Sequence, residues 1–160
     1  MISQDDIDGM QELEIKPDYC LAEFIKAFGA SLDPRLWINL IKEELEELYS
    51  EKVNTVEHLK EYVDLYYVTI GLSMVLKKGF TTGLLPEEEL KELKALLKKS
   101  DNALLGFHHV YGEPKIAEAF NRVHLSNMSK LGEDGKPIRR EDGKILKGPN
   151  YKAPDLTDLI

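Results

Sequence analysis

The sequence contains a single cysteine, Cys20, among 160 residues. One cysteine excludes an internal disulfide and fits a reducing compartment. Long hydrophobic runs are also missing, because the most apolar stretch, residues 62–76, is too short and too interrupted to span a bilayer. No basic segment followed by an apolar stretch opens the chain, so we expect no secretory signal. These features predict a cytoplasmic protein that does not enter a membrane.

Positive charge is scarce as well, with 21 Lys and Arg against 29 Asp and Glu. The resulting net charge of −8 argues against nucleic-acid binding, which needs a basic face. The charge is unevenly spread, however, since residues 130–152 hold seven Lys or Arg and four Asp or Glu. A basic arm on an acidic body suits a phosphate-bearing ligand that also carries metal ions; the alternative is a solvated tail without a specific role.

The length suits one domain with its own core, and we interpret residues 1–160 as a single domain. Residues 1–16 lack clear periodicity and form a loose lead-in, 17–130 form a helical core, and 131–160 form a basic C-terminal arm. Apolar spacing and capping residues predict an all-α bundle whose helices run from Pro17 to Gly29, from Asp33 to about Glu51, from Asn54-Thr55 to Gly79, from Pro86 onward, and from Gly112–Pro114 to about Ser129. Two Asp-Gly turns and three prolines predict an extended arm with one small hairpin.

The predicted helix over residues 35–51 separates its side chains into faces at about 100° per residue. Its core face consists of Trp37, Ile38, Ile41, Leu45 and Leu48. Three acids, Glu43, Glu44 and Glu47, fall within an arc of about 100° beside that face, with Glu44 nearest its apolar edge.

The next predicted helix, residues 55–78, is apolar around almost its whole circumference, which is typical of a central, buried helix. Glu61 and Asp64 lie one turn apart on it, and we expect no lysine or arginine to neutralise both. A buried carboxylate is costly unless it is paired or coordinates a metal. Because no His or Cys is interleaved, acids facing each other across the helix hairpin select Mg²⁺, with Mn²⁺ as a substitute.

The histidines give weak signals. His58 falls in the first turn of its predicted helix, where we expect it to be exposed. No Glu-x-x-His sequence occurs, which argues against a di-iron oxidase built on the same type of bundle.

Glu43-Glu44-Leu45-Glu46-Glu47, followed after thirteen residues by Glu61-Tyr62-Val63-Asp64, resembles the EExxE…ExxD signature of the MazG-like, all-α nucleoside triphosphate pyrophosphohydrolases. The resemblance covers most of the chain and includes the segments AEFIKAFG, VHLSNMSKL and DGKPIRREDGKILKGPNYKAPDL. It points to the stand-alone bacterial and phage members, which are similar to phosphoribosyl-ATP pyrophosphohydrolase. One departure is Leu125, which stands where a basic residue is expected.

The resemblance implies a role for each matching residue. Glu44, Glu47, Glu61 and Asp64 match the Mg²⁺ ligands, and Glu43 matches the residue that activates the attacking water. Asn127 and Lys130 match an Asn-x-x-Lys that contacts substrate phosphate or metal. In addition, we expect Lys144 and Lys147 of the arm to meet the phosphates as flexible point charges.

The implied reaction is hydrolysis of a nucleoside or deoxynucleoside triphosphate at the α-phosphorus, which gives the monophosphate and pyrophosphate. The sequence leaves the base open, with dUTP, dCTP and a purine such as dGTP as candidates. An alternative is a catalytically silent module whose acidic helices, with Glu61 and Asp64 exposed, dock a basic partner. An all-round apolar helix also predicts that oligomerisation completes the bundle, as a homodimer or homotetramer.

Overall fold

The computed structural model describes residues 16–77, 85–141 and 145–160. Within these ranges the chain is mainly helical, which confirms the all-α prediction. The elements are α2 (Pro17–Phe28), α3 (Pro34–Ser50), α4 (Val56–Lys77), α5 (Glu87–Tyr111), α6 (Glu113–Met128), β1 (Ile138–Arg139), β2 (Ile145–Leu146) and the short 3-10 helix η2 (Thr157–Leu159). Most of the predicted lead-in and the expected helix end at Gly79 lie outside the described residues.

The helix boundaries follow from local capping chemistry. Pro17 begins α2, and Gly29 ends it in the left-handed conformation at φ 57°, which glycine adopts without steric cost. The Asp33 side chain accepts a hydrogen bond from the backbone N–H two residues later, at 2.9 Å, and so caps α3. Thr55 Oγ1 accepts from the N–H three residues later, at 3.2 Å, at the start of α4.

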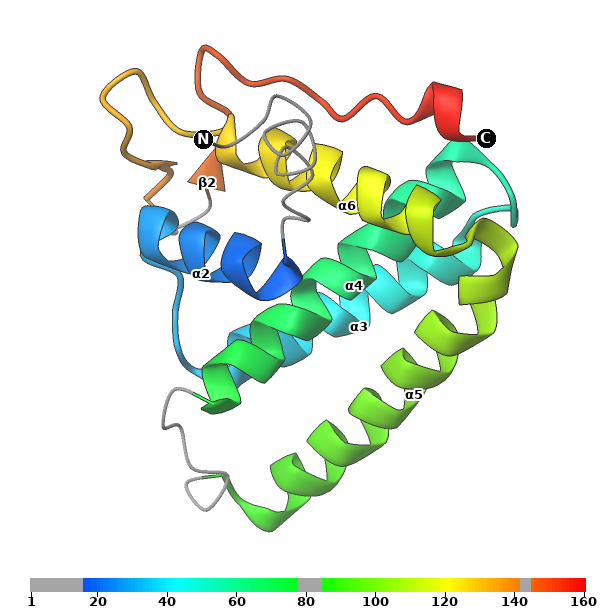
Figure 1. The fold of residues 1–160 in the computed structure, drawn as a ribbon. Coiled ribbons are helices and arrows are strands. Elements are labelled where there is room, and N and C mark those ends of the chain that lie inside the picture. The colour runs from blue at the N-terminus through cyan, green and yellow to red at the C-terminus, as the bar shows by residue number, and fades with distance from the viewer. Residues whose placement is uncertain (1–15, 78–84, 142–144) are drawn as a thin grey trace, which may run out of the picture.

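Helix α4 lies at the centre of the molecule and packs against α2, α3, α5 and α6 (Figure 1). Its buried residues include Leu59, Val63, Leu65 and Leu72, as expected for a helix that is apolar on nearly every side. Other helices of the same chain therefore cover α4. Its apolar character does not require a second copy, and oligomerisation stays a prediction.

The two helices that carry the acidic motif approach each other closely. Gly71 of α4 lies under the buried Trp37 ring of α3, where a Cβ atom would come within 2.0 Å of a ring carbon. Trp37 Nε1 donates to the carbonyl oxygen of Ser31 at 3.0 Å, which fixes the ring over the glycine. This contact sets the spacing of α3 and α4, and with it the spacing of their carboxylates.

The prediction that His58 is exposed is wrong, because its exposed fraction is 1%. Its Nδ1 lies 2.5 Å from the Tyr111 hydroxyl, and its ring packs edge-on against Phe107 at a centroid distance of 4.6 Å. The reason is the length of α5, whose C-terminal turns reach back over the start of α4. Burial lowers the pKa of His58.

The arm returns to the end of α6 after the predicted small hairpin. Strands β1 and β2 pair in antiparallel orientation, with Ile138 opposite Leu146. The Gly148 N–H donates to the carbonyl oxygen of Lys130 at 3.0 Å, and Arg122 of α6 holds Asp158 of η2 with two hydrogen bonds. Across the described ranges, we find no helix with the length and apolarity needed to cross a membrane.

Candidate metal centre

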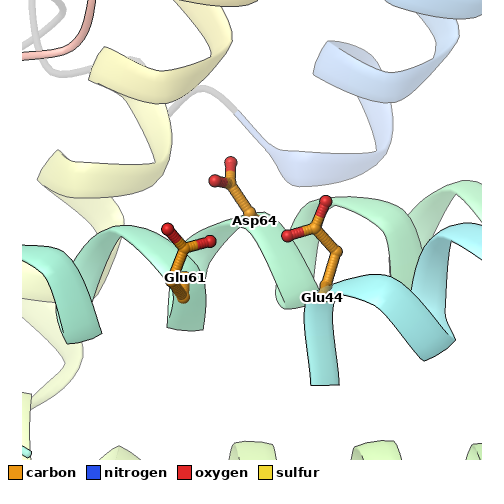
Figure 2. Close-up of side chains that lie close together, drawn as sticks. All are labelled: Glu44, Glu61 and Asp64. Carbon is orange, nitrogen blue, oxygen red and sulfur yellow. The ribbon is translucent and has the colours of Figure 1, made fainter. Parts of the chain in front are cut away.

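Three carboxylates of the predicted motif meet at the contact between α3 and α4. Glu44, Glu61 and Asp64 each offer an oxygen atom, and these atoms all lie within 4.8 Å of one another. Figure 2 shows the three side chains leaving α3 and α4 toward the side on which α2 and α6 lie. We call these three residues the carboxylate cluster.

Helical spacing explains why these acids converge. Glu44 is half-buried at the margin of the core face of α3, next to the buried Leu45. Glu61 and Asp64 are three residues apart, and so lie on the same side of α4. Close packing of the two helices then brings the acids from both into one group.

The carboxylate cluster contains buried oxygen atoms that lack hydrogen bonds. Glu44 Oε2 and Glu61 Oε2 are buried and have no hydrogen-bond partner among the described residues. Burial, followed by the nearby Asp64, Glu47 and Glu61, raises the pKa of Glu44 to about 8. A set of hard oxygen donors with two unpaired atoms fits Mg²⁺ or Mn²⁺, which take oxygen ligands.

The expectation that no basic residue neutralises both acids of α4 is wrong. Lys60 Nζ lies 3.1 Å from Glu61 Oε1 and 2.7 Å from Asp64 Oδ2. The i, i+4 spacing of Lys60 and Asp64 is the signal that identifies this pair in the sequence. One ammonium group among three carboxylates still leaves the cluster with an excess of acidic groups.

Glu43 and Glu47, the remaining acids of the motif, both lie exposed on α3. Glu47, the fourth expected ligand, is exposed and is not one of the three residues whose oxygens converge. Its charge does act on Glu61: burial raises the pKa of Glu61, Lys60 lowers it, and Glu47 also raises it. Glu43, the expected water-activating residue, lies exposed on α3 beside Glu44.

The residues expected to contact phosphate lie at the end of α6. Lys130 Nζ donates to Asn127 Oδ1 at 3.2 Å. Burial raises the pKa of Asp64, while Lys60 and, more weakly, Lys130 lower it. The charge of Lys130 therefore acts on Asp64 of the carboxylate cluster from the turn that follows α6.

The structure gives less support to the predicted contacts of the arm. Lys147 Nζ lies 4.7 Å from the centroid of the Tyr151 ring, in a cation–π contact within the arm. Lys144 falls outside the described residues. Leu125, the departure from the family pattern, is 59% exposed on α6.

The burial of the α4 acids also bears on the docking alternative, which requires them at the surface. Only 13% of the Glu61 side chain and 20% of the Asp64 side chain are exposed. Both turn inward toward Glu44, so a large part of their charge is hidden from a macromolecular partner.

The fold and the site together define a mainly helical protein with a half-buried cluster of carboxylates between two central helices. Comparisons of the chain with protein-family models, with curated proteins and with solved structures each found no match. The resemblance to MazG-like pyrophosphohydrolases therefore rests on the motif residues.

Proposed function

We propose that this chain is a Mg²⁺-dependent nucleoside triphosphate pyrophosphohydrolase of the MazG-like type. The proposal rests on two buried oxygens beside Asp64, Glu44 Oε2 and Glu61 Oε2, which have no hydrogen-bond partner among the described residues. Leaving such atoms unpaired costs free energy, which a bound divalent cation would recover.

The three residues of the carboxylate cluster would hold the cation, and Glu47 would join them by a change of rotamer at the protein surface. A bound cation would neutralise the charge of the triphosphate and lower the pKa of the attacking water. Lys60 would keep Glu61 and Asp64 ionised and oriented while the cation is absent.

Glu43 directly precedes Glu44 on α3 and is exposed to solvent. In the proposed reaction the oxygen of water bonds to the α-phosphorus while the bond from that phosphorus to the α,β-bridging oxygen breaks. Glu43 accepts the proton of the water as general base, and pyrophosphate leaves with the electron pair of the broken bond. Asn127 and Lys130 would hold the phosphates from the side of α6.

A product assay tests this proposal directly. Purified protein is incubated with Mg²⁺ and a panel of ribo- and deoxyribonucleoside triphosphates, and pyrophosphate and orthophosphate are measured separately. We expect pyrophosphate together with the nucleoside monophosphate. Release of orthophosphate alone would contradict attack at the α-phosphorus. The rates with dUTP, dCTP and dGTP would identify the preferred base.

Substitutions assign the activity to the cluster. Asp64→Asn and Glu47→Gln each preserve size but remove a charge, and we expect each to abolish turnover. The matched control is Glu46→Gln, because Glu46 is exposed on α3 and is not one of the clustered acids. If Asp64→Asn retains a rate near that of the wild type, the assignment of the site is wrong.

A thermal melt with added Mg²⁺ or Mn²⁺ separates the enzyme from the docking module. A site for a divalent cation predicts stabilisation that saturates with metal concentration. A surface that only docks a basic partner predicts almost no change in the melting temperature.

A further inference from the structure

Lys60 of α4 places a positive charge among the acids of the carboxylate cluster. Its Nζ donates to Asp64 Oδ2 at 2.7 Å and to Glu61 Oε1 at 3.1 Å. The i, i+4 spacing along α4 puts the ammonium group beside Asp64. Lysine is charged near neutral pH, so both contacts are charge-assisted hydrogen bonds. The ammonium group is therefore the counter-ion of the two α4 acids in this structure.

The ammonium group satisfies only part of the oxygen set. The described hydrogen bonds of Lys60 go to the two α4 acids and not to Glu44 of α3. Glu44 Oε2 and Glu61 Oε2 are buried and have no hydrogen-bond partner among the described residues. An ammonium group offers three donors, whereas Mg²⁺ is surrounded octahedrally by oxygen ligands. Lys60 is therefore an incomplete substitute for a divalent cation.

The ammonium group and a divalent cation would compete for the same side chains. Oxygen atoms of Glu44, Glu61 and Asp64 all lie within 4.8 Å of one another. A cation shared by these three residues would lie close to an ammonium group held by two of them. Two positive charges repel strongly where burial weakens the screening by water, and a protonated amine has no lone pair to offer a metal. Lys60 must therefore leave the carboxylates when they bind a cation.

The Lys60 side chain is free to leave the cluster. It is 43% exposed, compared with 13% for Glu61 and 20% for Asp64. Its flexible four-carbon stem brings the charge in from the surface of α4, and rotation of that stem returns the ammonium group to solvent. Displacement of the lysine therefore requires no movement of a helix.

We infer that Lys60 is a built-in competitor of the divalent cation, which weakens binding of the free ion and makes tight binding depend on the triphosphate. This inference rests on the proposed function, because it assumes that the cluster binds a cation together with a triphosphate. A triphosphate brings negative charge to the site, and the displaced ammonium group then pairs with a phosphate oxygen. The cost of displacement is offset only when substrate is present, so cation and substrate favour each other's binding.

Lys60→Met tests the competition, because it removes the ammonium group and keeps an apolar stem. The matched control is Lys42→Met, since Lys42 of α3 is 44% exposed and pairs with Glu92 of α5. Calorimetry with Mn²⁺ alone measures the Kd. We expect this Kd to fall about tenfold in Lys60→Met and to stay within about twofold of wild type in Lys42→Met.

Lys60→Arg provides the conservative comparison. It keeps the positive charge next to Glu61 and Asp64, so we expect it to bind Mn²⁺ as weakly as the wild type. Binding of Mn²⁺ by Lys60→Met that is equal to or weaker than that of the wild type would overturn the inference. A merely structural role for Lys60 predicts this weaker binding, because loss of the lysine would then disorder the acids.

An inorganic triphosphate analogue with imido bridges, which resist hydrolysis, tests the dependence on the triphosphate. At saturating Mn²⁺ the ammonium group is already displaced, so the Kd for the analogue reports its contact with phosphate. We expect this Kd to rise about tenfold in Lys60→Met, opposite in direction to the change for Mn²⁺ alone, and less than about twofold in Lys42→Met. An unchanged Kd in Lys60→Met would overturn this dependence.

NMR of the wild-type protein provides a readout that needs no substitution and no turnover. In ¹⁵N-edited spectra at low temperature, saturating Mg²⁺ should shift or broaden the ammonium signal of Lys60 and leave that of Lys42 unchanged. A Lys60 signal that Mg²⁺ leaves in place would overturn the inference, even where Lys60→Met does not fold. If the wild type binds no triphosphate analogue, the proposed function fails, while the Mn²⁺ and NMR titrations still decide whether Lys60 competes with the cation.

Discussion

Glu44 is held by the fold in an environment that disfavours its charge. Its carboxyl lies beside Asp64, Glu47 and Glu61, and burial contributes most to its raised pKa. In the unfolded chain this pKa is near 4.5, and in the folded protein it is about 8. Between these pH values the folded state binds more protons than the unfolded state, so this residue makes folding less favourable as pH rises.

Glu44→Gln should therefore stabilise the metal-free protein at alkaline pH. In EDTA at about pH 8.5 we expect its free energy of unfolding to exceed that of the wild type by roughly 1–2 kcal/mol, with little difference near pH 5. Urea titrations at several pH values measure this difference. Glu46→Gln is the exposed control and should show no such pH dependence. Mn²⁺ should stabilise Glu44→Gln less than the wild type. Equal stabilisation of the two proteins would show that Glu44 is not a ligand of the cation.

Lys60 acts as an internal cation for the cluster, since its ammonium group contacts both Glu61 and Asp64. Burial lowers the pKa of Lys60, but Asp64 and Glu61 raise it by more, so the residue is charged across the physiological range.

Lys60→Met tests whether a bound metal ion can stabilise the protein in place of this ammonium group. In EDTA we expect a loss of about 1–3 kcal/mol in the free energy of unfolding, because two half-buried acids lose their counter-ion. Saturating Mn²⁺ should restore most of it. Lys91→Met is the control, since Lys91 pairs only with exposed glutamates among its described contacts. This substitution should change the free energy of unfolding by less than about 0.5 kcal/mol. A loss in Lys60→Met that Mn²⁺ leaves unchanged would contradict a shared site.

At the scale of elements, the close approach of α3 and α4 depends on a missing side chain. A methyl group at Gly71 would overlap the Trp37 ring, which is buried and hydrogen-bonded and so cannot move aside. Around Gly106, in the interior of α5, no described atom other than those of its chain neighbours and the local helix backbone lies within 4 Å of the position that a Cβ would take.

These two glycines predict opposite outcomes for the same substitution. Gly71→Ala should destabilise the protein by about 2–4 kcal/mol through overpacking, and should weaken Mn²⁺ binding by moving Glu44 away from Glu61 and Asp64. Gly106→Ala should stabilise it by about 0.5–1 kcal/mol, the difference in helix propensity. Thermal and urea unfolding measure both. If Gly71→Ala leaves the free energy of unfolding unchanged, the contact between α3 and α4 at Trp37 has room for a methyl group, which would contradict this prediction.

The sequence predicts elements well where the cause is local. Pro17, Gly29 and Asp33 mark helix ends because capping acts within a few residues, and the apolar periods of α3 and α4 predict their buried faces. The site is predicted in part, since helical spacing places Glu61 and Asp64 on one side. The sequence does not predict the burial of His58, because that burial depends on the position of Tyr111, which is distant in the sequence.

Other contacts in the core also join distant segments. The Tyr67 hydroxyl lies 2.9 Å from His124 Nδ1, which requires the relative register of α4 and α6, and no local signal in the chain encodes that register. The pairing of Lys60 is different, since its spacing from Asp64 is visible in the sequence.

At the scale of the whole molecule, we predict a homodimer or homotetramer. Large apolar side chains such as Tyr49 and Leu105 are 64% and 70% exposed, and burying them would favour association. Light scattering coupled to gel filtration measures the mass at assay concentration. We expect a particle mass of two or four times the 18.2 kDa of one chain. A species of that mass alone would show that the α4 contacts within one chain suffice for a stable fold.

The most direct measurement is anomalous diffraction from crystals soaked in Mn²⁺, because it locates the ion without reference to activity. We predict a peak bounded by carboxylate oxygens of Glu44, Glu61 and Asp64, and the loss of that peak in Asp64→Asn crystals. An ordered structure with no peak at this position, in wild-type crystals soaked at saturating Mn²⁺, would contradict it.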